Sequence, residues 1–123
     1  MLDATEFATL ATLNPNGYPH LSVVWLERDG DDLLVSTIKG RRKHLNMERD
    51  PRVTILVYPQ DDPYSYIELR GTVTMTDEGG RELIDRLNDR YTGTGRFTGD
   101  DGTDNVRVVC RITPDKVVMR LPH

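Results

Sequence analysis

Four basic side chains lie close together in the middle of a chain that is otherwise acidic. They surround Gly40 and follow two hydroxyl residues, Ser36 and Thr37; the four are Lys39, Arg41, Arg42 and Lys43. The apolar residues 33–35 predict a strand before this group, and residues 41–49 predict a short helix that ends before Pro51. The unpaired N–H groups and the positive dipole end of that helix would point toward the same place. The pattern therefore predicts an anion-binding site at a strand-to-helix turn.

The alternative is that the four cations form a solvated helix face, which is the common role of a charge cluster. The helix dipole argues against this alternative, because it disfavours cations in the first turn. The cost is about 0.3 kcal/mol or more for each cation unless an anion offsets it. We therefore favour the anion site, although these residues alone do not name the anion.

Composition limits the classes of protein to which the chain can belong. It has 123 residues, a hydrophobic share of 37%, a charged share of 29% and a net charge of −4. We expect a single domain over residues 1–123, because this length supports one core but not two. A general nucleic-acid binder would need a basic face along the phosphates, which an acidic chain does not suggest. No apolar run reaches the roughly 20 residues of a membrane span.

The remaining reactive side chains suggest no second site. Cys110 is the one cysteine, which excludes an internal disulfide and predicts a buried thiol within a strand. We expect His20 at the surface beside a turn and His44 on a solvated helix face, so no metal site has usable ligand spacing. The residues before position 7 carry acids where a signal peptide carries bases, which predicts a cytoplasmic protein. The sequence identifies no catalytic residue.

Short strands separated by turn residues dominate the chain. Alternation and turn signals predict strands over residues 7–13, 19–28, 32–37, 52–58, 64–75, 106–112 and 117–121. Asp3 can start a helical turn, Asp77 can cap a helix that buries Leu83, Ile84, Leu87 and Tyr91, and Gly71 predicts a bulge. The glycines of residues 92–103 predict a mobile loop at the mouth of a pocket. The absence of a βαβ rhythm predicts a mostly β protein, a closed or nearly closed antiparallel barrel with two or three short helices.

Two of the expected strands are apolar on both faces. Residues 19–28 and 52–58 have apolar side chains at odd and even positions alike. A barrel strand needs one apolar face for its own core, and one amphipathic helix cannot cover all of the second faces. We therefore expect a homodimer in which a partner subunit covers part of this surface.

The order of these segments resembles the split-β-barrel flavin and deazaflavin oxidoreductases related to pyridoxamine 5′-phosphate oxidase. Three stretches carry the resemblance: the opening hairpin at residues 11–22, the basic segment at residues 36–51, and the long strand at residues 64–71. The Lys-Gly-Arg-x-Lys form of the basic segment is similar to that of short members that use coenzyme F420, a deazaflavin. The resemblance implies an FMN-binding split-barrel fold and a homodimer with cofactor sites at the subunit interface.

The resemblance also implies roles for individual residues. Arg41 and Lys43 would hold the phosphate and acidic tail of the cofactor, with Lys39 and Arg42 beside them. The ring or its polyol chain would lie along Ser36, Thr37 and Ile38. The neighbouring strand would flank the ring with Leu21, Ser22, Val23, Val24 and Trp25. Tyr64 and Tyr66 of the partner subunit would close the site.

The function that follows from the resemblance is that of an F420-dependent reductase. It would transfer a hydride from the reduced deazaflavin to a conjugated small-molecule substrate, since the cofactor supplies the reactivity and the protein positions it. One alternative is an FMN-dependent oxidase or reductase of the same fold. Another is a non-catalytic carrier that holds a deazaflavin, flavin or haem without turnover.

Overall fold

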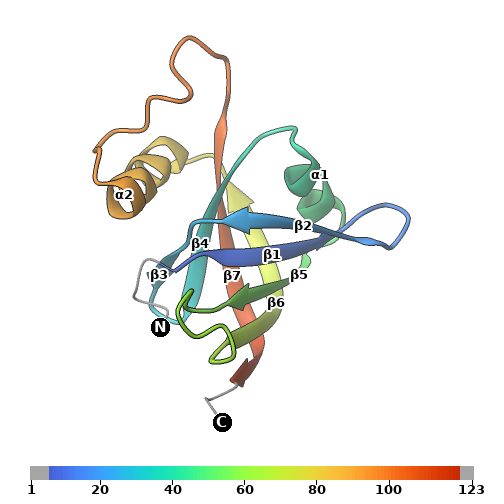
Figure 1. Cartoon of the computed structure of the whole chain (residues 1–123). Helices are drawn as coiled ribbons and strands as arrows, with labels where there is room; N and C mark the ends of the chain where they lie inside the picture. Colours follow the sequence, from blue (N-terminus) through green and yellow to red (C-terminus); the bar gives the residue numbers. More distant parts are fainter. Residues whose placement is uncertain (1–5, 120–123) are drawn as a thin grey trace.

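Seven antiparallel strands form one sheet in the order β2-β1-β5-β6-β7-β4-β3, and the sheet curls into a half-barrel (Figure 1). The structure is a computed structural model and describes residues 6–119. This architecture confirms the predicted mostly β, split-barrel fold. The elements in chain order are β1 (Ala8–Leu13), β2 (Pro19–Val24), β3 (Glu27–Asp29), β4 (Asp32–Ile38), α1 (Arg42–Arg49), β5 (Arg52–Val57), β6 (Ile67–Thr76), α2 (Gly80–Thr92) and β7 (Arg107–Met119).

Alternation along the strands builds the core inside the half-barrel. Leu10 of β1, Ile55 of β5 and Val35 of β4 are fully buried there, because every second residue of a strand faces the same side. Cys110 of β7 belongs to the same core, as predicted. Its burial raises the pKa of the thiol to about 12, so the thiol stays protonated and unreactive.

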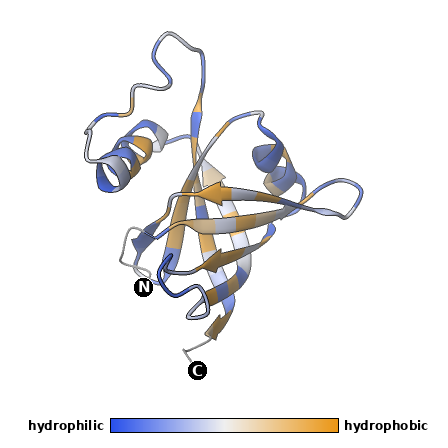
Figure 2. Ribbon diagram, viewed as in Figure 1, coloured by the Kyte–Doolittle hydropathy of each residue, from blue (hydrophilic) through white to orange (hydrophobic). Residues whose placement is uncertain are grey.

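The two helices cover different parts of the sheet. Leu83 and Leu87 of α2 pack against Leu34 on the outer face of β4, and this contact forms a second, smaller core. α1 contacts β1 and β4 instead. Figure 1 shows the two helices at the same end of the half-barrel, with β4 and β7 running between them in this view. In Figure 2 the hydrophobic residues of α2 lie on part of the helix, while α1 is mostly polar.

The outer face of β2 is apolar and uncovered within the chain. Leu21 is 62% exposed and Val23 is 69% exposed, whereas Val24, next along the strand, is buried. On β5, Leu56 also lies on the outer face and is half-buried. The strands with two apolar faces thus leave one of them open, and a partner subunit over this face remains a prediction.

The predicted hairpin at the C-terminal end is wrong. β7 runs without a turn from Arg107 to Met119 and pairs with β6 from Val109 to Met119. The chain passes Pro114 because Gly71 lies opposite it, and the missing side chain of Gly71 lets the Thr113 carbonyl come close. The register shifts between Arg70 and Gly71, which confirms the predicted bulge.

The strand predicted over residues 19–28 is interrupted between β2 and β3. At the break, the Leu26 N–H donates to the Tyr91 hydroxyl of α2 (3.1 Å), and the Trp25 ring stacks on the Tyr91 ring at 5.2 Å. These contacts with α2 replace the sheet hydrogen bonds. The break therefore has a tertiary cause, which the alternation of the segment does not show.

Two further boundaries differ from the prediction. β6 begins at Ile67, because residues 59–66 turn instead, with the Ser65 N–H donating to the Asp62 carbonyl (3.1 Å). α2 begins at Gly80 without a side-chain cap, and Asp77 contributes its backbone carbonyl to the Gly80 N–H (3.1 Å). The helical turn expected at Asp3 lies outside the described residues. No helix within residues 6–119 is long and apolar enough to cross a membrane.

Candidate functional site

The turn before α1 is shaped by a glycine and a buried histidine. Gly40 has a φ of 91°, a backbone conformation that side chains disfavour. Its N–H donates to His44 Nδ1 at 3.0 Å, which fixes the neutral tautomer with the proton on Nε2. His44 is 6% exposed, so the prediction that it is solvated is wrong. It faces back into the turn and supports the segment that presents the cations.

The N-terminal end of α1 is left open for an anion. Arg41 occupies the N-cap position and makes no side-chain cap hydrogen bond, and the first turn contains no acidic residue. The backbone N–H groups of this turn therefore keep their donor capacity. The Thr37 hydroxyl, on β4 before this turn, is buried and has no hydrogen-bond partner within the described part of the chain. The open N–H groups at the start of α1 suit a phosphate oxygen.

The cations of this segment are unpaired. Among residues 6–119, no carboxylate lies within salt-bridge distance of the set Lys39, Arg41, Arg42 and Lys43. Other basic residues do form pairs; Arg52, for example, contacts Asp50 at 2.7 Å. Most of the other described arginines contact a carboxylate, so a group of unpaired cations in this acidic chain indicates a place for a negatively charged ligand.

Lys43 links this segment to β2. Its Nζ donates to the Ser22 hydroxyl at 3.3 Å. Burial lowers the pKa of Lys43, and the nearby positive charges of Arg41 and Arg107 lower it further. The ammonium group is therefore held in an environment that disfavours its charge. A bound anion would reverse that effect.

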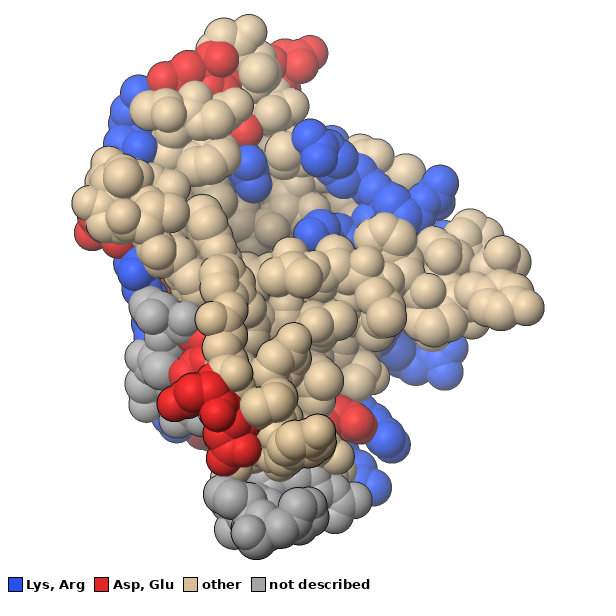
Figure 3. All heavy atoms as spheres, in the orientation of Figure 1, with Lys and Arg blue, Asp and Glu red and all other residues tan. Residues whose placement is uncertain are grey.

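Two cavities meet at Lys43. One has a volume of about 250 Å³ and an apolar wall from β2 and α2, with Val23, Trp25, Ile84 and Leu87 among its lining residues. The other has a volume of about 320 Å³ and is more polar, with Thr37, Ile38, Arg41 and Asn105 in its lining. Lys43, Phe97 and Arg107 line both. Figure 3 shows Lys and Arg side chains around a hollow between the part of the molecule that carries α2 and the part that carries α1.

The chemistry of this paired site is that of a ligand with two different ends. A flat apolar group can lie against the β2 and α2 side chains, while a negatively charged group lies against the cations and the α1 N-terminus. Within the described residues, no three His, Cys, Asp or Glu side chains are grouped to hold a metal ion. The site therefore has the features of a binding site for an anionic aromatic cofactor.

The comparisons with known proteins agree with this geometry. The sequence model of one family, described as pyridoxamine 5′-phosphate oxidase, matches residues 1–120. The chain belongs to this family. A solved structure named F420 reductase has 30% sequence identity and a TM-score of 0.83, over 95% of this chain and 92% of that one. The chain thus has the fold and family of a flavin-binding split-barrel oxidoreductase.

Two further solved structures are similar. The conserved hypothetical protein Rv2991 from Mycobacterium tuberculosis has 26% identity and a TM-score of 0.77, over 98% of this chain and 84% of that one. The General Stress Protein 26 from Bacillus anthracis shares the fold, with 20% identity, a TM-score of 0.74, and 99% and 89% of the two chains covered. Both support the split-barrel fold of the family over nearly the whole chain.

The structure brings many of the predicted site residues around the two cavities. Those that line them are Val23, Val24, Trp25, Ser36, Thr37, Ile38, Arg41 and Lys43. Ser22 lies next to them through its contact with Lys43. The remaining predicted residues do not line these cavities: Leu21, Lys39, Arg42, Tyr64 and Tyr66. Leu21 and Tyr64 are 62% and 70% exposed, so both side chains are accessible to a second subunit.

Sequence reasoning missed the residues that reach the site from the end of the chain. Phe97 and Arg107 line both cavities, and Asp100 lines the polar one. Arg107 lies beside Ser36 because β7 pairs with β4, a contact between residues 71 positions apart. No local sequence pattern predicts such a contact. The missed signal was the polar stripe of α2, which anchors the segment that carries Phe97 and Asp100.

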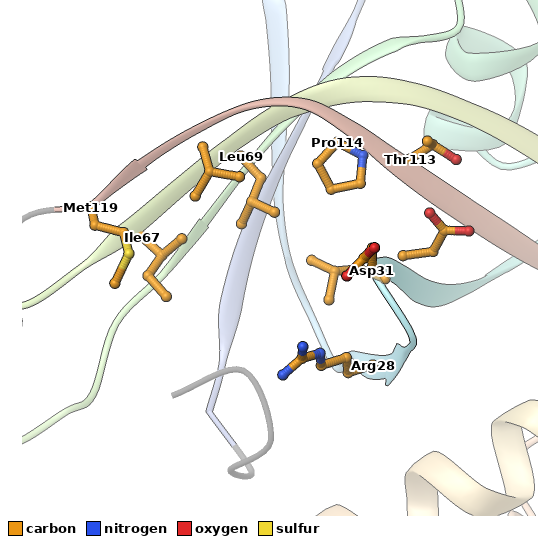
Figure 4. A pocket seen from close by; sticks show the side chains of 10 residues that line it. Arg28, Asp31, Ile67, Leu69, Thr113, Pro114 and Met119 are labelled. Atoms are coloured by element: carbon orange, nitrogen blue, oxygen red, sulfur yellow. The ribbon is translucent and has the colours of Figure 1, made fainter.

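A larger cavity lies elsewhere and involves none of the predicted site residues. It has a volume of about 760 Å³ and opens between the β3–β4 turn and the ends of β6 and β7. Figure 4 shows Ile67, Leu69 and Met119 along one side, with Arg28 and Asp31 on another. Its lining is mainly apolar and lacks the unpaired cations of the site at α1. We therefore assign cofactor binding to the two smaller cavities.

Proposed function

We propose that this protein is a coenzyme F420-dependent reductase that acts as a homodimer. The observation that carries the proposal is the unpaired cation cluster of residues 39–43 beside an apolar cavity. The F420 tail contains a phosphodiester and several carboxylates, so it needs more cations than a single phosphate does. The similarity to a structure named F420 reductase supports the same cofactor.

The polar cavity suits the tail of the cofactor. Arg41 can bind an oxyanion with two parallel N–H groups, and Lys43 supplies a point charge next to it. Thr37 and Ile38 of β4 line the cavity beside these two cations. Lys39 and Arg42 lie outside the cavity, where they would meet the later carboxylates of an extended tail.

The apolar cavity suits the ring. Val23 at the end of β2 and Trp25 just after it line the cavity together with Ile84 and Leu87 from α2. These side chains would hold the ring flat and exclude water from one of its faces. When bound, the reduced deazaflavin supplies the hydride, and the protein positions it against the substrate. The chain needs to contribute no acid or base of its own for hydride transfer.

The partner subunit completes the proposed site. The uncovered apolar face of β2, with Leu21 and Val23, continues directly into the apolar cavity, because Val23 belongs to both. A second copy over this face would bury these side chains and bring Tyr64 and Tyr66 toward the ring. We expect a mass of twice 14.0 kDa by light scattering, and dissociation of the dimer in the Leu21→Glu variant.

FMN is the second candidate cofactor, because the family match itself points to flavin chemistry. FMN has one phosphate, which Arg41, Lys43 and the α1 N-terminus could bind without the other cations. A protein that binds either cofactor without turnover would be a carrier. The number of cations that contribute to binding separates F420 from FMN, and turnover separates an enzyme from a carrier.

A fluorescence titration tests the proposal. The purified protein is titrated with F420 and with FMN, and the Lys43→Glu and Lys116→Glu variants are compared. Lys116 is an exposed lysine of β7 that lines neither cavity, so it is a control for charge alone. We expect tighter binding of F420 than of FMN, lost in Lys43→Glu and kept in Lys116→Glu. Tight FMN binding that Lys43→Glu leaves unchanged would contradict the proposal, and bound F420 without turnover of enones, quinones or tetrapyrroles would support the carrier.

A further inference from the structure

Residues 93–106, which we call the arm, connect α2 to β7 and lie along both cavities. The polar side of α2 holds the arm in place. The Phe97 N–H donates to Asp85 Oδ1 at 2.9 Å, and Asn88 Nδ2 donates to the Gly95 carbonyl at 2.8 Å. Arg81 donates to the Phe97 carbonyl at 3.3 Å. The glycines of this segment predict mobility, yet the helix offers a row of partners that fit one conformation of it.

Asp100 is the one acidic residue of the arm that is buried in the described structure, with 7% of its surface exposed. Its carboxylate accepts from Arg107 Nε at 2.7 Å and from Arg107 Nη2 at 3.1 Å, a two-pronged contact. Asn105 and Arg81 also donate to it, at 3.0 and 3.1 Å. These donors lower the pKa of the Asp100 carboxyl to about 2, with Arg107 as the largest cause. The carboxylate is therefore charged and fully engaged at neutral pH.

The contact with Asp100 sets the position of the Arg107 guanidinium in the proposed cofactor site. Arg107 Nη1 is 3.4 Å from the Ser36 hydroxyl, and the guanidinium lies 5.0 Å from the centre of the Phe97 ring. The guanidinium of Arg107 has five N–H groups on three nitrogens. Within the described residues each nitrogen makes one hydrogen bond, so two N–H groups have no partner there. The remaining N–H groups are on the two Nη atoms. They are available at a residue that lines both cavities.

We propose that Arg107 is a further anion-binding residue of the cofactor site and that Asp100 is the residue that positions it. The inference rests on the proposed function, because it assigns the anion to the bound cofactor. The Nη donors of Arg107 bind an oxygen of the cofactor between its ring and its tail, next to Ser36. Phe97, stacked against the guanidinium, closes the same part of the pocket. The arm is therefore a built part of the site, which α2 and Asp100 hold in place before the cofactor binds.

Two roles of Asp100, a negative charge near the anion or a residue that positions Arg107, predict opposite changes in anion affinity when its carboxylate is removed. Removing a carboxylate beside an anion site would strengthen anion binding if only the net charge mattered. If Asp100 positions Arg107, its removal releases the guanidinium and weakens binding, even though the site becomes more positive. The Asp100→Asn variant separates the two, because an amide of the same size has one acceptor oxygen and cannot hold both guanidinium nitrogens.

The experiment compares Asp100→Asn with Asp101→Asn and Arg107→Lys. Asp101 is an exposed neighbour whose carboxylate pairs with Arg96, so its variant removes the same charge away from the cavities. We expect F420 to bind about 10-fold more weakly to Asp100→Asn and 10- to 100-fold more weakly to Arg107→Lys, which keeps the charge but loses the planar fork. Asp101→Asn should bind as the wild type does. Unchanged or tighter binding to Asp100→Asn would overturn the inference.

Hydrogen exchange without cofactor provides a readout that does not depend on the proposed function. We expect the backbone amides of residues 93–106 to exchange faster in Asp100→Asn than in the wild type or in Asp101→Asn. Equal exchange in all three would overturn the positioning role of Asp100. If the wild type binds neither F420 nor FMN, the proposed function fails and the anion role of Arg107 fails with it. If the wild type binds F420 and Arg107→Lys binds it equally well, only the present inference fails.

Discussion

Replacing Lys43 with methionine should stabilise the cofactor-free protein and weaken cofactor binding at the same time. The cofactor-free protein holds a half-buried ammonium group without a carboxylate partner, and burial and two neighbouring guanidinium groups lower its pKa. Methionine keeps the length of the side chain and removes the unfavourable charge. We expect the free energy of unfolding to rise by about 0.5–1 kcal/mol, within the usual range for substitutions that remove an unfavourable group from a functional site.

The gain corresponds to a measurable shift in melting temperature. With about 2.1 cal/mol/K of unfolding entropy per residue, a chain of 123 residues unfolds with about 0.26 kcal/mol/K. The Lys43→Met variant should therefore melt about 2–4 °C higher than the wild type by differential scanning fluorimetry. The matched variant Lys116→Met, on exposed β7, should melt within about 1 °C of the wild type.

The same substitution removes a charge-assisted hydrogen bond to the cofactor. Such a bond contributes about 1.5–3 kcal/mol, which corresponds to about 10- to 100-fold weaker F420 binding in Lys43→Met. Lys116→Met should bind F420 as the wild type does. A Lys43→Met protein that melts below the wild type, or that keeps its affinity, would refute the reasoning, because Lys43 would then serve folding and not the anion.

Three further predictions concern the framework of the site. Tyr91→Phe leaves the Leu26 N–H without its acceptor and should cost about 1–3 kcal/mol in urea unfolding, while Tyr18→Phe, at an exposed tyrosine, should cost nothing measurable. Gly71→Ala places a methyl group against the Thr113 carbonyl and should cost about 2 kcal/mol or more, unlike Thr72→Ala beside it. The folded pKa of Asp100, about 2, lies below the ordinary value of 3.8, so its contribution to stability is present above about pH 4 and is lost as the pH falls toward 2. The protection of the arm amides, calculated against their intrinsic exchange rates at each pH, should therefore fall over that range in the wild type and not in Asp100→Asn; constant protection in the wild type would contradict the lowered pKa of Asp100.

The strands of the barrel could be predicted because their cause is local. Alternation of apolar residues and the turn signals at residues 14–17 and 29–31 place β1, β4 and β5 correctly, since burial on one face of a strand leaves a period of two in the sequence. The glycine at position 71 also predicted a bulge, although the residues that approach it, Thr113 and Pro114, lie on another strand. α1 was predicted within one residue, with Arg41 at the cap and not inside the helix.

Two of the three main errors have causes outside the local sequence. Pro114 and Asp115 have the composition of a turn, but Gly71 on another strand lets β7 continue through them. The break after Val24 depends on Tyr91, which lies 65 residues from Leu26. His44 has the sequence context of a solvated residue and is buried because its ring accepts the Gly40 N–H. The first two features require contacts that a window of sequence does not contain, whereas the His44 contact spans four residues and depends on the positive φ of Gly40.

The residues of the candidate site also fall into those that the sequence predicts and those that only tertiary contacts bring to the site. The cations were found from a contiguous motif and residues 21–25 from the family resemblance. Phe97, Asp100 and Arg107 reach the site through the pairing of β7 with β4 and the docking of the arm on α2. A polar stripe on α2, with partners at positions 81, 85 and 88, could have indicated that the following segment is anchored. The apolar pattern of that helix predicts only the face that packs on the sheet.

The most direct measurement compares F420 with the same deazaflavin chromophore lacking the phosphate and glutamate tail. Both ligands contain the ring, so the difference in their dissociation constants reports what residues 39–43 and the α1 N-terminus contribute. We predict that F420 binds at least about 100-fold more tightly than the tailless compound, a difference of about 2.7 kcal/mol, and that the difference shrinks as salt is raised. Equal affinity for the two ligands would contradict the central claim that this cation cluster binds the anionic tail of the cofactor.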